Sequence, residues 1–453
     1  MRRVSSTPQV SSLRPIAVAA YGPTVLSSIG TGAVVPVLAL TARDLGASVG
    51  TAAVIVSLLG VGMLVGDLPA GALAARFGER RALLAASLAE ATGMAAAGLA
   101  PSVLTLGAAV FALGLAGSVF GLARHAYLTE AVAPSLRARA LSTLGGVHRV
   151  GIFVGPFLGA AVLGWWGSIG PYAVGAVAAL AAAALVSVTK DLADRDAARH
   201  AQRATRVSSA RAGGVGGPGG AERLGRPERL TVVRVLREHR RVLTTLGVGV
   251  LAVAAARAAR NAIVPLWAEA IGLDAASTSI VFGLSGAADM LLFYPAGWAM
   301  DRFGRVHVAV PSMLVLGVGM VLVPLASSFL TLVAVAIVLG IGNGIGSGIL
   351  MTLGADASPE VGRAQFLGGW RLMGDVGWAG GPALVSAVAV LGSLGSASVV
   401  MGVVAWAGAA WLRVWVPRFD PVGRGRPPGT SRLAPGLTQG VSPDPGPDPS
   451  RGQ

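Results

Sequence analysis

Long apolar stretches separated by short polar segments run along most of the chain. Each is at least about 18 residues long, enough for a helix to cross a hydrocarbon core about 30 Å thick. We predict twelve membrane-spanning helices, at about 14–41, 48–74, 81–101, 104–132, 139–166, 170–189, 242–269, 275–300, 307–326, 329–355, 364–392 and 396–416. The predicted fold class is therefore all-α and integral to the membrane.

Composition supports this prediction and excludes several kinds of chemistry. Hydrophobic residues make up 53% of the chain and charged residues only 13%, against about 25% charged in an ordinary soluble domain. The absence of cysteine excludes disulfides, thiolate metal sites and cysteine nucleophiles. No HExxH, GxSxG with triad partners or P-loop occurs, which argues against a membrane enzyme and an ATP-driven pump. We predict a protein that is not an enzyme and has no cofactor or metal.

The net charge of +15 could indicate a nucleic-acid or anionic-lipid partner, but its placement favours another explanation. Arginines follow the second, fourth, eighth and tenth spans, and the opposite loops contain only Arg43. Excess arginine in short loops marks the cytoplasmic side. We therefore expect a multi-pass protein of the cell membrane with both termini cytoplasmic, lipid as its surroundings and no nucleic-acid partner.

Four segments follow from these patterns. Residues 1–189 form a six-helix half, 190–241 a basic flexible cytoplasmic linker, 242–416 a second six-helix half, and 417–453 a disordered cytoplasmic tail. The linker and the tail are assigned from their arginine-, glycine- and proline-rich composition. Contact of either with lipid headgroups is an alternative, although a solvated tether is the simpler explanation.

The two halves repeat each other at an offset of 226 residues. "PAGALAARFGERR" begins at Pro69 and "PAGWAMDRFGRVH" at Pro295, and Gly155-Pro156 matches Gly381-Pro382. Six spans per half is an even number, so both halves start on the same side of the membrane. Parallel repeats of this kind place a binding site near the membrane midplane, where the halves meet.

The repeated loop carries a recognisable pattern, Gly-x-x-x-Asp-Arg-x-Gly-Arg. The second half contains Gly297, Asp301, Arg302, Gly304 and Arg305, and the first half contains Gly71, Arg76, Gly78, Arg80 and Arg81, with Ala75 at the acidic position. This pattern resembles the signature of the major facilitator superfamily. Together with the spans and the repeat, it implies a transporter with the twelve-helix fold of that superfamily.

The chemistry of this loop can be argued from its residue types. Gly71 and Gly297 lack a Cβ and would admit a neighbouring helix, while Gly78 and Gly304 permit a tight turn. The arginines can bind helix C-terminal carbonyls and carboxylates. The resemblance implies a latch that closes the cytoplasmic side in the outward-open state, and Ala75 removes one carboxylate from it. The alternative is a topology signal alone.

The fifth span contains a second pattern, formed by Gly151, Gly155, Pro156 and Gly159. It resembles the end of the antiporter motif of drug-exporting members, although the leading glycine of that motif falls at Ser142. The mid-span arginine that many exporters carry before Gly117 is missing. The alternative is close packing and a kink without any role in exchange.

Ionisable residues within spans are costly and usually functional. The candidates for proton coupling are, in order, Asp289, Asp375 and Glu90; the candidates for substrate contacts or ion pairs are Arg257, Arg260, Asn261, Arg124, Arg149 and Arg371. From their depth, we expect Arg257 to pair with Asp289, and Asp67, Glu90, Arg124 and Arg149 to form one network within the first half. Arg371 and Asp375 share a helix face. Permanent structural pairing is the competing explanation, and His125 and His148 receive little weight.

These patterns favour a secondary active transporter, with proton-coupled export of small amphipathic or drug-like molecules as the leading function. The alternative is uptake or facilitated diffusion of a polar or anionic metabolite, which the five arginines against four carboxylates within the spans would suit. A non-transporting sensor that kept the fold is a third possibility. The expected partners are a small-molecule substrate and protons, and the expected state is a monomer.

Overall fold

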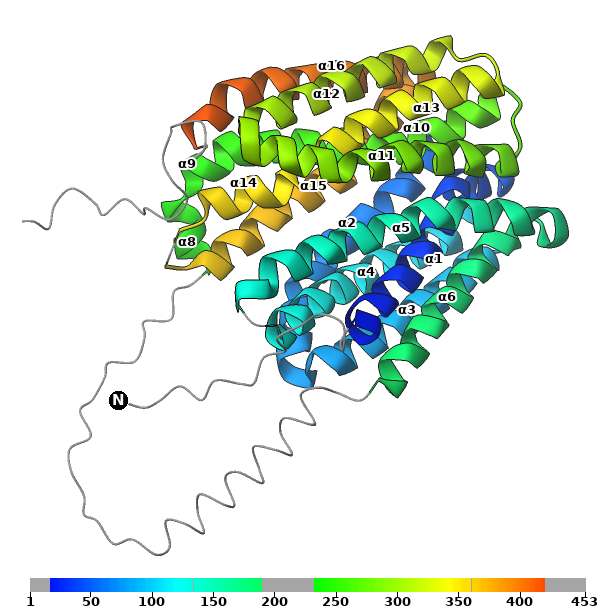
Figure 1. Cartoon of the computed structure of the whole chain (residues 1–453). Helices are drawn as coiled ribbons and strands as arrows, with labels where there is room; N and C mark the ends of the chain where they lie inside the picture. Colours follow the sequence, from blue (N-terminus) through cyan, green and yellow to red (C-terminus); the bar gives the residue numbers. More distant parts are fainter. Residues whose placement is uncertain (1–16, 133, 190–231, 360, 420–453) are drawn as a thin grey trace, which may run out of the picture.

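The computed structural model describes residues 17–132, 134–189, 232–359 and 361–419. These residues form a bundle of long helices (Figure 1). The first six helices are α1 (Ala17–Asp44), α2 (Val49–Phe77), α3 (Glu79–Gly98), α4 (Val103–Ala131), α5 (Pro134–Trp166) and α6 (Ile169–Val188). The later helices are α8 (Val232–Glu238), α9 (Arg240–Val242), α10 (Val248–Ala270), α11 (Ala275–Phe303), α12 (Val306–Leu322), α13 (Phe329–Ile345), α14 (Ile349–Ala357), α15 (Arg363–Leu391) and α16 (Leu394–Trp415).

Helix ends follow local sequence signals. Ser102, Ser328 and Ser393 each begin a helix with a capping box, in which the serine hydroxyl accepts the N–H three residues on and a Thr or Ser returns a bond. Gly46 and Gly272, with φ of 86° and 81°, end the first helix of each half. Glycine is favoured at such C-terminal positions because it adopts positive φ without steric cost.

The structural repeat keeps the register of the sequence repeat. α2 spans 49–77 and α11 spans 275–303, so the two differ by 226 residues at both ends. α4 corresponds in the same way to α13 and α14 taken together. The fold therefore consists of two six-helix units, α1–α6 and α10–α16, drawn in blue to green and in green to red (Figure 1).

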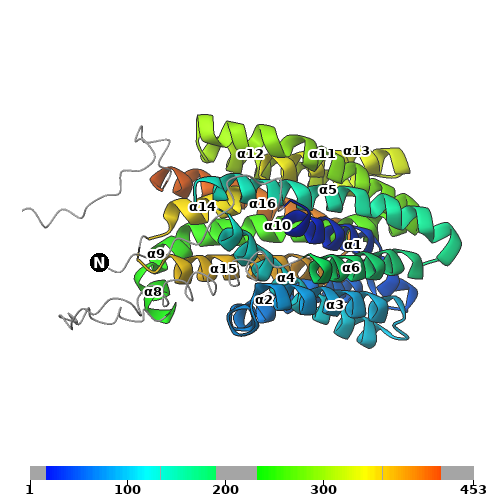
Figure 2. The ribbon, with the colours of Figure 1, turned by 60° about the horizontal axis from the view of Figure 1, so that its bottom comes forward.

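Two long helix pairs join the units. α2 packs against α15, and α5 packs against α11 (Figure 2). Both pairs combine the second helix of one unit with the fifth helix of the other. We name the end of the bundle that carries the Gly78 and Gly304 loops the basic end, and the opposite end the far end.

The glycines of the fifth span are used for packing. A Cβ on Gly155 would collide with the Ile29 carbonyl of α1, and a Cβ on Gly381 would collide with the Ala255 carbonyl of α10. Gly151 lies against Val25 and Ser28 in the same way, and Gly159 lies against Ala33. Pro156 lies inside α5 and Pro382 inside α15. Close packing of this kind therefore occurs in both units, including the one without the exporter-like pattern.

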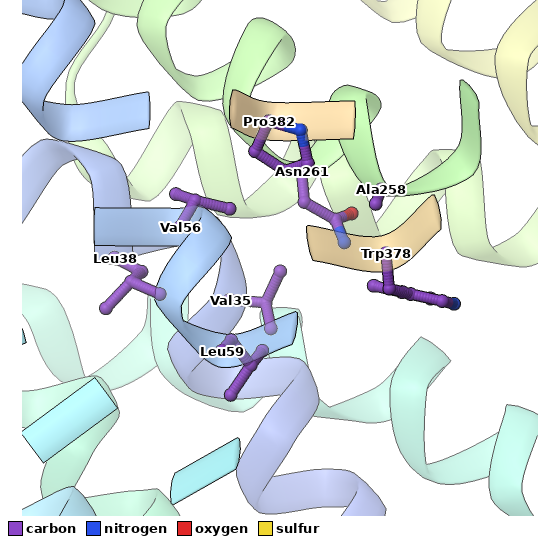
Figure 3. A pocket seen from close by; sticks show the side chains of 8 residues that line it. All are labelled: Val35, Leu38, Val56, Leu59, Ala258, Asn261, Trp378 and Pro382. Carbon is purple, nitrogen blue, oxygen red and sulfur yellow. The ribbon is translucent and has the colours of Figure 1, made fainter. Parts of the chain in front are cut away.

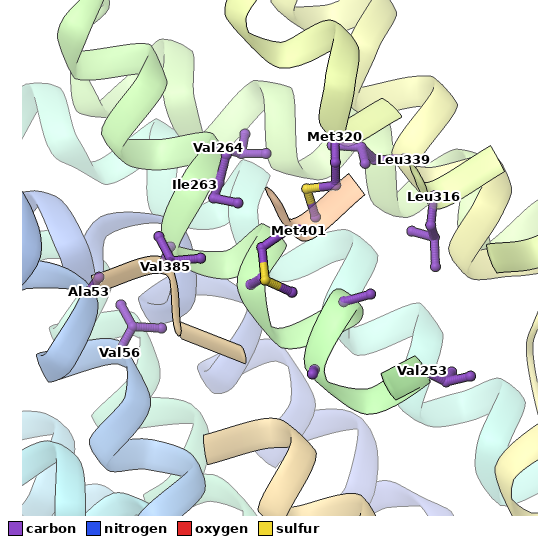
Figure 4. Close-up of a cluster of buried hydrophobic side chains, with 14 of the residues drawn as sticks. Ala53, Val56, Val253, Ile263, Val264, Leu316, Met320, Leu339, Val385 and Met401 are labelled. Carbon is purple, nitrogen blue, oxygen red and sulfur yellow. The ribbon is translucent and has the colours of Figure 1, made fainter. Parts of the chain in front are cut away.

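Apolar side chains fill the space between these helices. In the second unit Val253, Ile263 and Val264 of α10 belong to one buried cluster with Met320 and Met401 (Figure 4). The same buried cluster continues across the boundary between the units, where Ala53 and Val56 of α2 lie near Val385 of α15. The contact between units is thus partly an ordinary apolar core.

Eleven stretches of helix in the described ranges are long and apolar enough to span a membrane. α3 supplies the remaining predicted span; its 20 residues include Glu79, Arg80, Arg81 and Glu90, which lower its hydropathy. The tenth predicted span is interrupted between α13 and α14, where Gly348 has φ 78°.

The segment from 232 to 241, which the sequence assigned to the linker, is largely helical. Val235 of α8 is buried, and His239 makes an edge contact with the ring of Phe366. The apolar positions of "VVRVLRE" explain this docking, because they can cover α15. The rest of the predicted linker and nearly all of the predicted tail lie outside the described residues.

Candidate functional site

An ion pair joins the two units in the middle of the bundle. Arg149 of α5 donates from Nη1 to both carboxylate oxygens of Asp289 on α11, at 2.9 and 2.8 Å. Ser347 adds a longer bond to Asp289, at 3.4 Å, and the Phe293 ring lies 4.8 Å from the Arg149 guanidinium carbon. Asp289 is buried. The prediction that Arg257 pairs with Asp289 is therefore wrong, because the partner comes from the other unit.

A second charged group joins the units at the α2–α15 contact. Arg371 Nε lies 2.8 Å from Asp67 Oδ2 and 3.8 Å from Asp375 Oδ2. Ser118 of α4 donates to Asp67 at 2.5 Å. The Asp67 and Asp375 carboxyl groups lie within electrostatic range of each other, and Asp375 Oδ2 is buried without a hydrogen-bond partner in the described part of the chain. Two carboxyl groups thus share one guanidinium.

Glu90 lies within the first unit. It is buried on α3 and accepts a hydrogen bond of 2.9 Å from Ser27 of α1. Arg124 of α4 lies within electrostatic range of Glu90, and its guanidinium carbon lies 5.8 Å from the centre of the Phe120 ring. The predicted network within the first half is therefore only partly present: Glu90 and Arg124 belong to it, whereas Asp67 and Arg149 bind residues of the second unit.

The two histidines make local hydrogen bonds. His125 Nδ1 lies 2.6 Å from the carbonyl oxygen of Gly121 on its own helix. His148 Nδ1 lies 2.6 Å from Ser28 Oγ on α1. No group of three or more His, Asp or Glu side chains able to hold a metal ion occurs among the residues that the structure describes.

Arg257 supports the interruption between α13 and α14. Its Nη2 donates to the carbonyl oxygens of Asn343 and Gly346, at 3.3 and 2.6 Å. These carbonyls belong to the C-terminal end of α13, where helix carbonyls lack partners in their own helix. A Cβ on Gly346 would lie 2.5 Å from the same Nη2. Glycine therefore leaves room for the guanidinium.

Arg260 lies one turn further along α10. Its Nη1 donates to Ser285 of α11 at 3.3 Å, and its Nε is buried without a hydrogen-bond partner among the described residues. Asn261, the next residue, lines a small cavity at the junction of four helices from both units (Figure 3). Val35, Leu59 and Trp378 contribute apolar walls to that cavity.

A further ion pair between the units closes the far end. Arg43 Nε, at the end of α1, donates to both oxygens of Glu269, at the end of α10, at 2.9 and 3.0 Å. The two residues are 226 positions apart, so they occupy equivalent places in the two units. Arg43 also donates from Nη1 to the Ala47 carbonyl at 2.6 Å.

The repeated loop at the basic end contains the predicted tight turns. Gly78 and Gly304 have φ of 82° and 89°. Arg80 donates to the carbonyl oxygens of Val186 and Ser187, at 3.1 and 2.8 Å. These carbonyls end α6, as expected for arginines that bind a helix C-terminus.

The remaining charges of the loop motif make contacts within their own unit. Arg305 Nε lies 2.7 Å from Asp356 of α14. Arg302 lies over the rings of Trp298 and Phe303, and Arg76 lies over the ring of Phe77. Asp301 is exposed and has no ion-pair partner within the described ranges.

Gly71 and Gly297, which were expected to admit a neighbouring helix, have none of the described helices packed closely against them in this conformation. A Cβ on Gly297 would meet no atom within 4 Å, and one on Gly71 would make a single ordinary contact, at 3.7 Å from Leu122. With the Arg43–Glu269 pair formed at the far end and no ion-pair partner for Asp301 among the described residues, the part of this loop that the structure describes forms no latch between the units.

Four features of the site did not emerge from the sequence argument. The sequence contained a signal for the Arg43–Glu269 pair, because Arg43 is the single arginine in the far-side loops and Glu269 lies at the repeat offset of 226 residues from it. The helix interruption had a signal in "GIGNGIGSG", which places glycine at every second position from 340 to 348. The pairing of Asp67 with Arg371 and the proximity of Asp67 to Asp375 had no such signal, since the helices involved are distant in sequence.

Comparison with known proteins agrees with the fold. A family model described as Major Facilitator Superfamily matches residues 24–255 and 246–443. The chain is 26% identical over 319 residues to the multidrug resistance protein MdtH of Enterobacter sp. (strain 638), covering 69% of this chain and 71% of that protein.

Solved transporters share the architecture. A POT family transporter in complex with a thioalcohol conjugated peptide superposes with a TM-score of 0.70 at 12% identity, covering 90% of this chain and 96% of that one. A D-xylose-proton symporter gives 0.67 at 13% identity, covering 90% and 98%. At such identities the likeness shows the fold alone. The family match, the repeat and the loop motif together establish that this chain belongs to the major facilitator superfamily of membrane transporters.

Proposed function

We propose that the protein is a proton-coupled secondary transporter that exports small amphipathic molecules by alternating access, as a monomer in the plasma membrane. The basic end faces the cytoplasm, because it carries the excess of arginine. Similarity to a multidrug resistance protein supports export. The observation that carries proton coupling is the shared guanidinium of Arg371, which faces both Asp67 and Asp375.

Two carboxylates that lie close to one another repel each other, and a proton bound to either of them removes that repulsion. Arg371 neutralises one negative charge, so the group is balanced when one proton is bound. Asp67 belongs to the first unit, whereas Asp375 and Arg371 belong to the second. Movement of the units apart would separate the carboxyl groups and change their proton affinity. Under this proposal, proton binding is coupled to the conformational change.

Asp289 is a weaker candidate than the sequence suggested, because Arg149 already binds both of its oxygens. Asp375 retains an oxygen without a hydrogen-bond partner in the described part of the protein. We therefore assign proton exchange to the Asp67–Asp375 group. Asp289 would instead orient Arg149, and Glu90 would bind Ser27.

The test uses proteoliposomes with an imposed pH gradient and a panel of amphipathic dyes of either charge. Asp375→Asn should abolish gradient-driven dye accumulation while leaving dye exchange without a gradient intact. Asp44→Asn is a matched control, since Asp44 is exposed at the far end of α1. Gradient-driven transport by Asp375→Asn at the wild-type rate would refute the assignment.

Uptake or facilitated diffusion of an anionic metabolite remains the second candidate function. The arginines on α10, whose donors are only partly used, favour it. Dye that only equilibrates across the membrane in the wild-type protein, at a rate that does not respond to the pH gradient, would support facilitated diffusion over proton-coupled export.

A further inference from the structure

Two arginines of α10 have hydrogen-bonding capacity that the structure does not use. A guanidinium group carries five N–H donors. Arg257 directs Nη2 to helix carbonyls, and Arg260 directs Nη1 to Ser285. The Nε atoms of both are buried and have no hydrogen-bond partner in the described ranges. A buried donor without a partner is costly, so a ligand that accepts these bonds would be stabilised.

The local charge balance points to an anion. Arg257 and Arg260 lie within electrostatic range of Arg149 and of one carboxylate, Asp289. Asp289 is already bound by Arg149 through both oxygens. Three guanidinium groups thus face one carboxylate, which leaves two formal positive charges. A guanidinium in a poorly solvated site requires a counter-charge.

The surroundings of this charge are apolar on one side. Asn261 follows Arg260 directly and extends into the small cavity between Val35 and Trp378 (Figure 3). Leu59 forms another wall. The cavity lies at the level of the arginines along α10, because Ala258 and Asn261, which line it, directly follow Arg257 and Arg260 in the sequence. Charged donors and apolar walls therefore adjoin each other at the boundary of the units.

We propose that Arg260, assisted by Arg257 and Asn261, forms a subsite for the oxyanion group of an amphipathic organic anion, whose apolar part lies against Val35 and Trp378. The proposal rests on the proposed transport function and names the class of substrate. A carboxylate matches the planar fork of a guanidinium, and a phosphate monoester offers the same oxygen acceptors.

Arg260 is the residue to test, because Arg257 also has a structural role at the end of α13. Full-length protein in nanodiscs of zwitterionic lipid is titrated calorimetrically with naphthoate, naphthamide and naphthyl phosphate, with empty nanodiscs as blank. The three probes share an apolar skeleton and differ in the charge and geometry of the polar group. Arg413→Gln is the matched control, since Arg413 is exposed near the end of α16.

Wild-type protein and Arg413→Gln should bind naphthoate or naphthyl phosphate at least about tenfold more tightly than naphthamide, as expected for charge-assisted hydrogen bonds. Arg260→Gln should reduce that ratio to near one. Arg260→Lys, which keeps the charge without the fork, should retain only part of it and serves where the glutamine variant does not fold. The preferred anion distinguishes carboxylate from phosphate chemistry.

Equal wild-type affinity for naphthoate, naphthyl phosphate and naphthamide would overturn the proposal, as would an unchanged ratio in Arg260→Gln. This measurement needs no gradient, so it is independent of the transport test. Anion selectivity without gradient-driven flux would refute the proposed function alone, and gradient-driven flux without anion selectivity would refute the subsite alone.

Discussion

The ion pair between Arg43 and Glu269 closes the far end, and its removal should open that end more often. Glu269→Gln is the better perturbation, because Arg43 also binds the loop between α1 and α2 through the Ala47 carbonyl. Removing Arg43 would lose that bond as well. Glu269→Gln keeps the size of the side chain and removes only the charge.

The expected magnitude follows from the exposure of the pair. The side chains of Arg43 and Glu269 are 32% and 34% exposed, so water and salt screen their attraction. Pairs of this kind contribute up to about 1 kcal/mol, which corresponds to roughly a fivefold change in an equilibrium constant. The population open at the far end should therefore rise by up to about fivefold, and added salt should diminish the difference between variant and wild type.

Site-specific labelling can measure this change, because the chain contains no cysteine. A single Leu38→Cys reporter lies in the closed cavity, where Leu38 is only 2% exposed. A membrane-impermeant maleimide added at the far end should label it about fivefold faster in Glu269→Gln, and Asp44→Asn should leave the rate unchanged.

The pseudo-symmetry provides a rescue experiment. Gly46 donates to the Arg43 carbonyl at 2.8 Å and Gly272 donates to the Glu269 carbonyl at 2.9 Å, so the two helix ends have the same geometry. An arginine at position 269 can therefore reach the loop that follows its helix as Arg43 does. The double exchange Arg43→Glu with Glu269→Arg should restore slow labelling. Fast labelling in the double exchange, or wild-type labelling in Glu269→Gln, would refute the far-end gate.

Three further predictions concern stability. Gly381→Ala should lower the free energy of unfolding by about 1–3 kcal/mol through overpacking against α10. Gly297→Ala should change it by less than about 0.5 kcal/mol, because no atom of the described residues lies within 4 Å of the added Cβ. Unfolding in mixed micelles measures both variants, and equal losses would contradict the packing explanation. Gly348→Ala should cost about 1–2 kcal/mol in the same assay, because alanine adopts positive φ poorly, and a smaller loss would show that the interruption relaxes. The Ser277 hydroxyl and backbone N–H hydrogen-bond to Asp274 and hold the pKa of that carboxyl below its ordinary value of 3.8. The stabilising effect of Asp274 should therefore be complete above pH 3.8 and be lost as the pH falls through the lower folded-state pKa. A thermal-stability difference between wild type and Asp274→Ala that is unchanged at acid pH would contradict this prediction.

The sequence predicted the helices better than their partners. Apolar runs mark each span, and the glycines at 78 and 304 mark turns that few other residues could form. Depth along a helix was also informative, since Arg257 and Asp289 do lie within electrostatic range. Pairing depends in addition on the rotation of each helix and on the approach of the other unit. Neither is encoded in residue spacing, and so Arg149 was missed as the partner of Asp289.

The interruption of the tenth span shows a different limit. α4 runs without a break through the positions that correspond to the gap between α13 and α14. The apolar pattern is similar in both, so hydropathy gave the same expectation for each. The difference lies in glycine at 344, 346 and 348 and in the arginine on α10 that satisfies the freed carbonyls. Such a break is stable only where another helix supplies donors.

The two charged contacts between the units are related by the repeat but are not superimposable. In each, the fifth helix of one unit supplies an arginine and the second helix of the other supplies an aspartate. By the 226-residue offset, Asp289 corresponds to Met63 and Asp67 to Phe293, so the aspartates differ by four residues, or about 6 Å along the helix.

Because of this displacement, the two contacts have different residues facing each other at each of two levels along the helices. At the level of Asp67 and Arg371, the other contact has Phe293 against Gly145, which is apolar. At the level of Arg149 and Asp289, the α2–α15 contact has Asp375 at the position that corresponds to Arg149, and Met63 at the position that corresponds to Asp289. Asp375 therefore occupies a place where symmetry provides no cation on α2. The asymmetry between the units leaves one carboxyl group only partly neutralised at their contact. Under the proposed function, this is the position where a bound proton would have the largest effect.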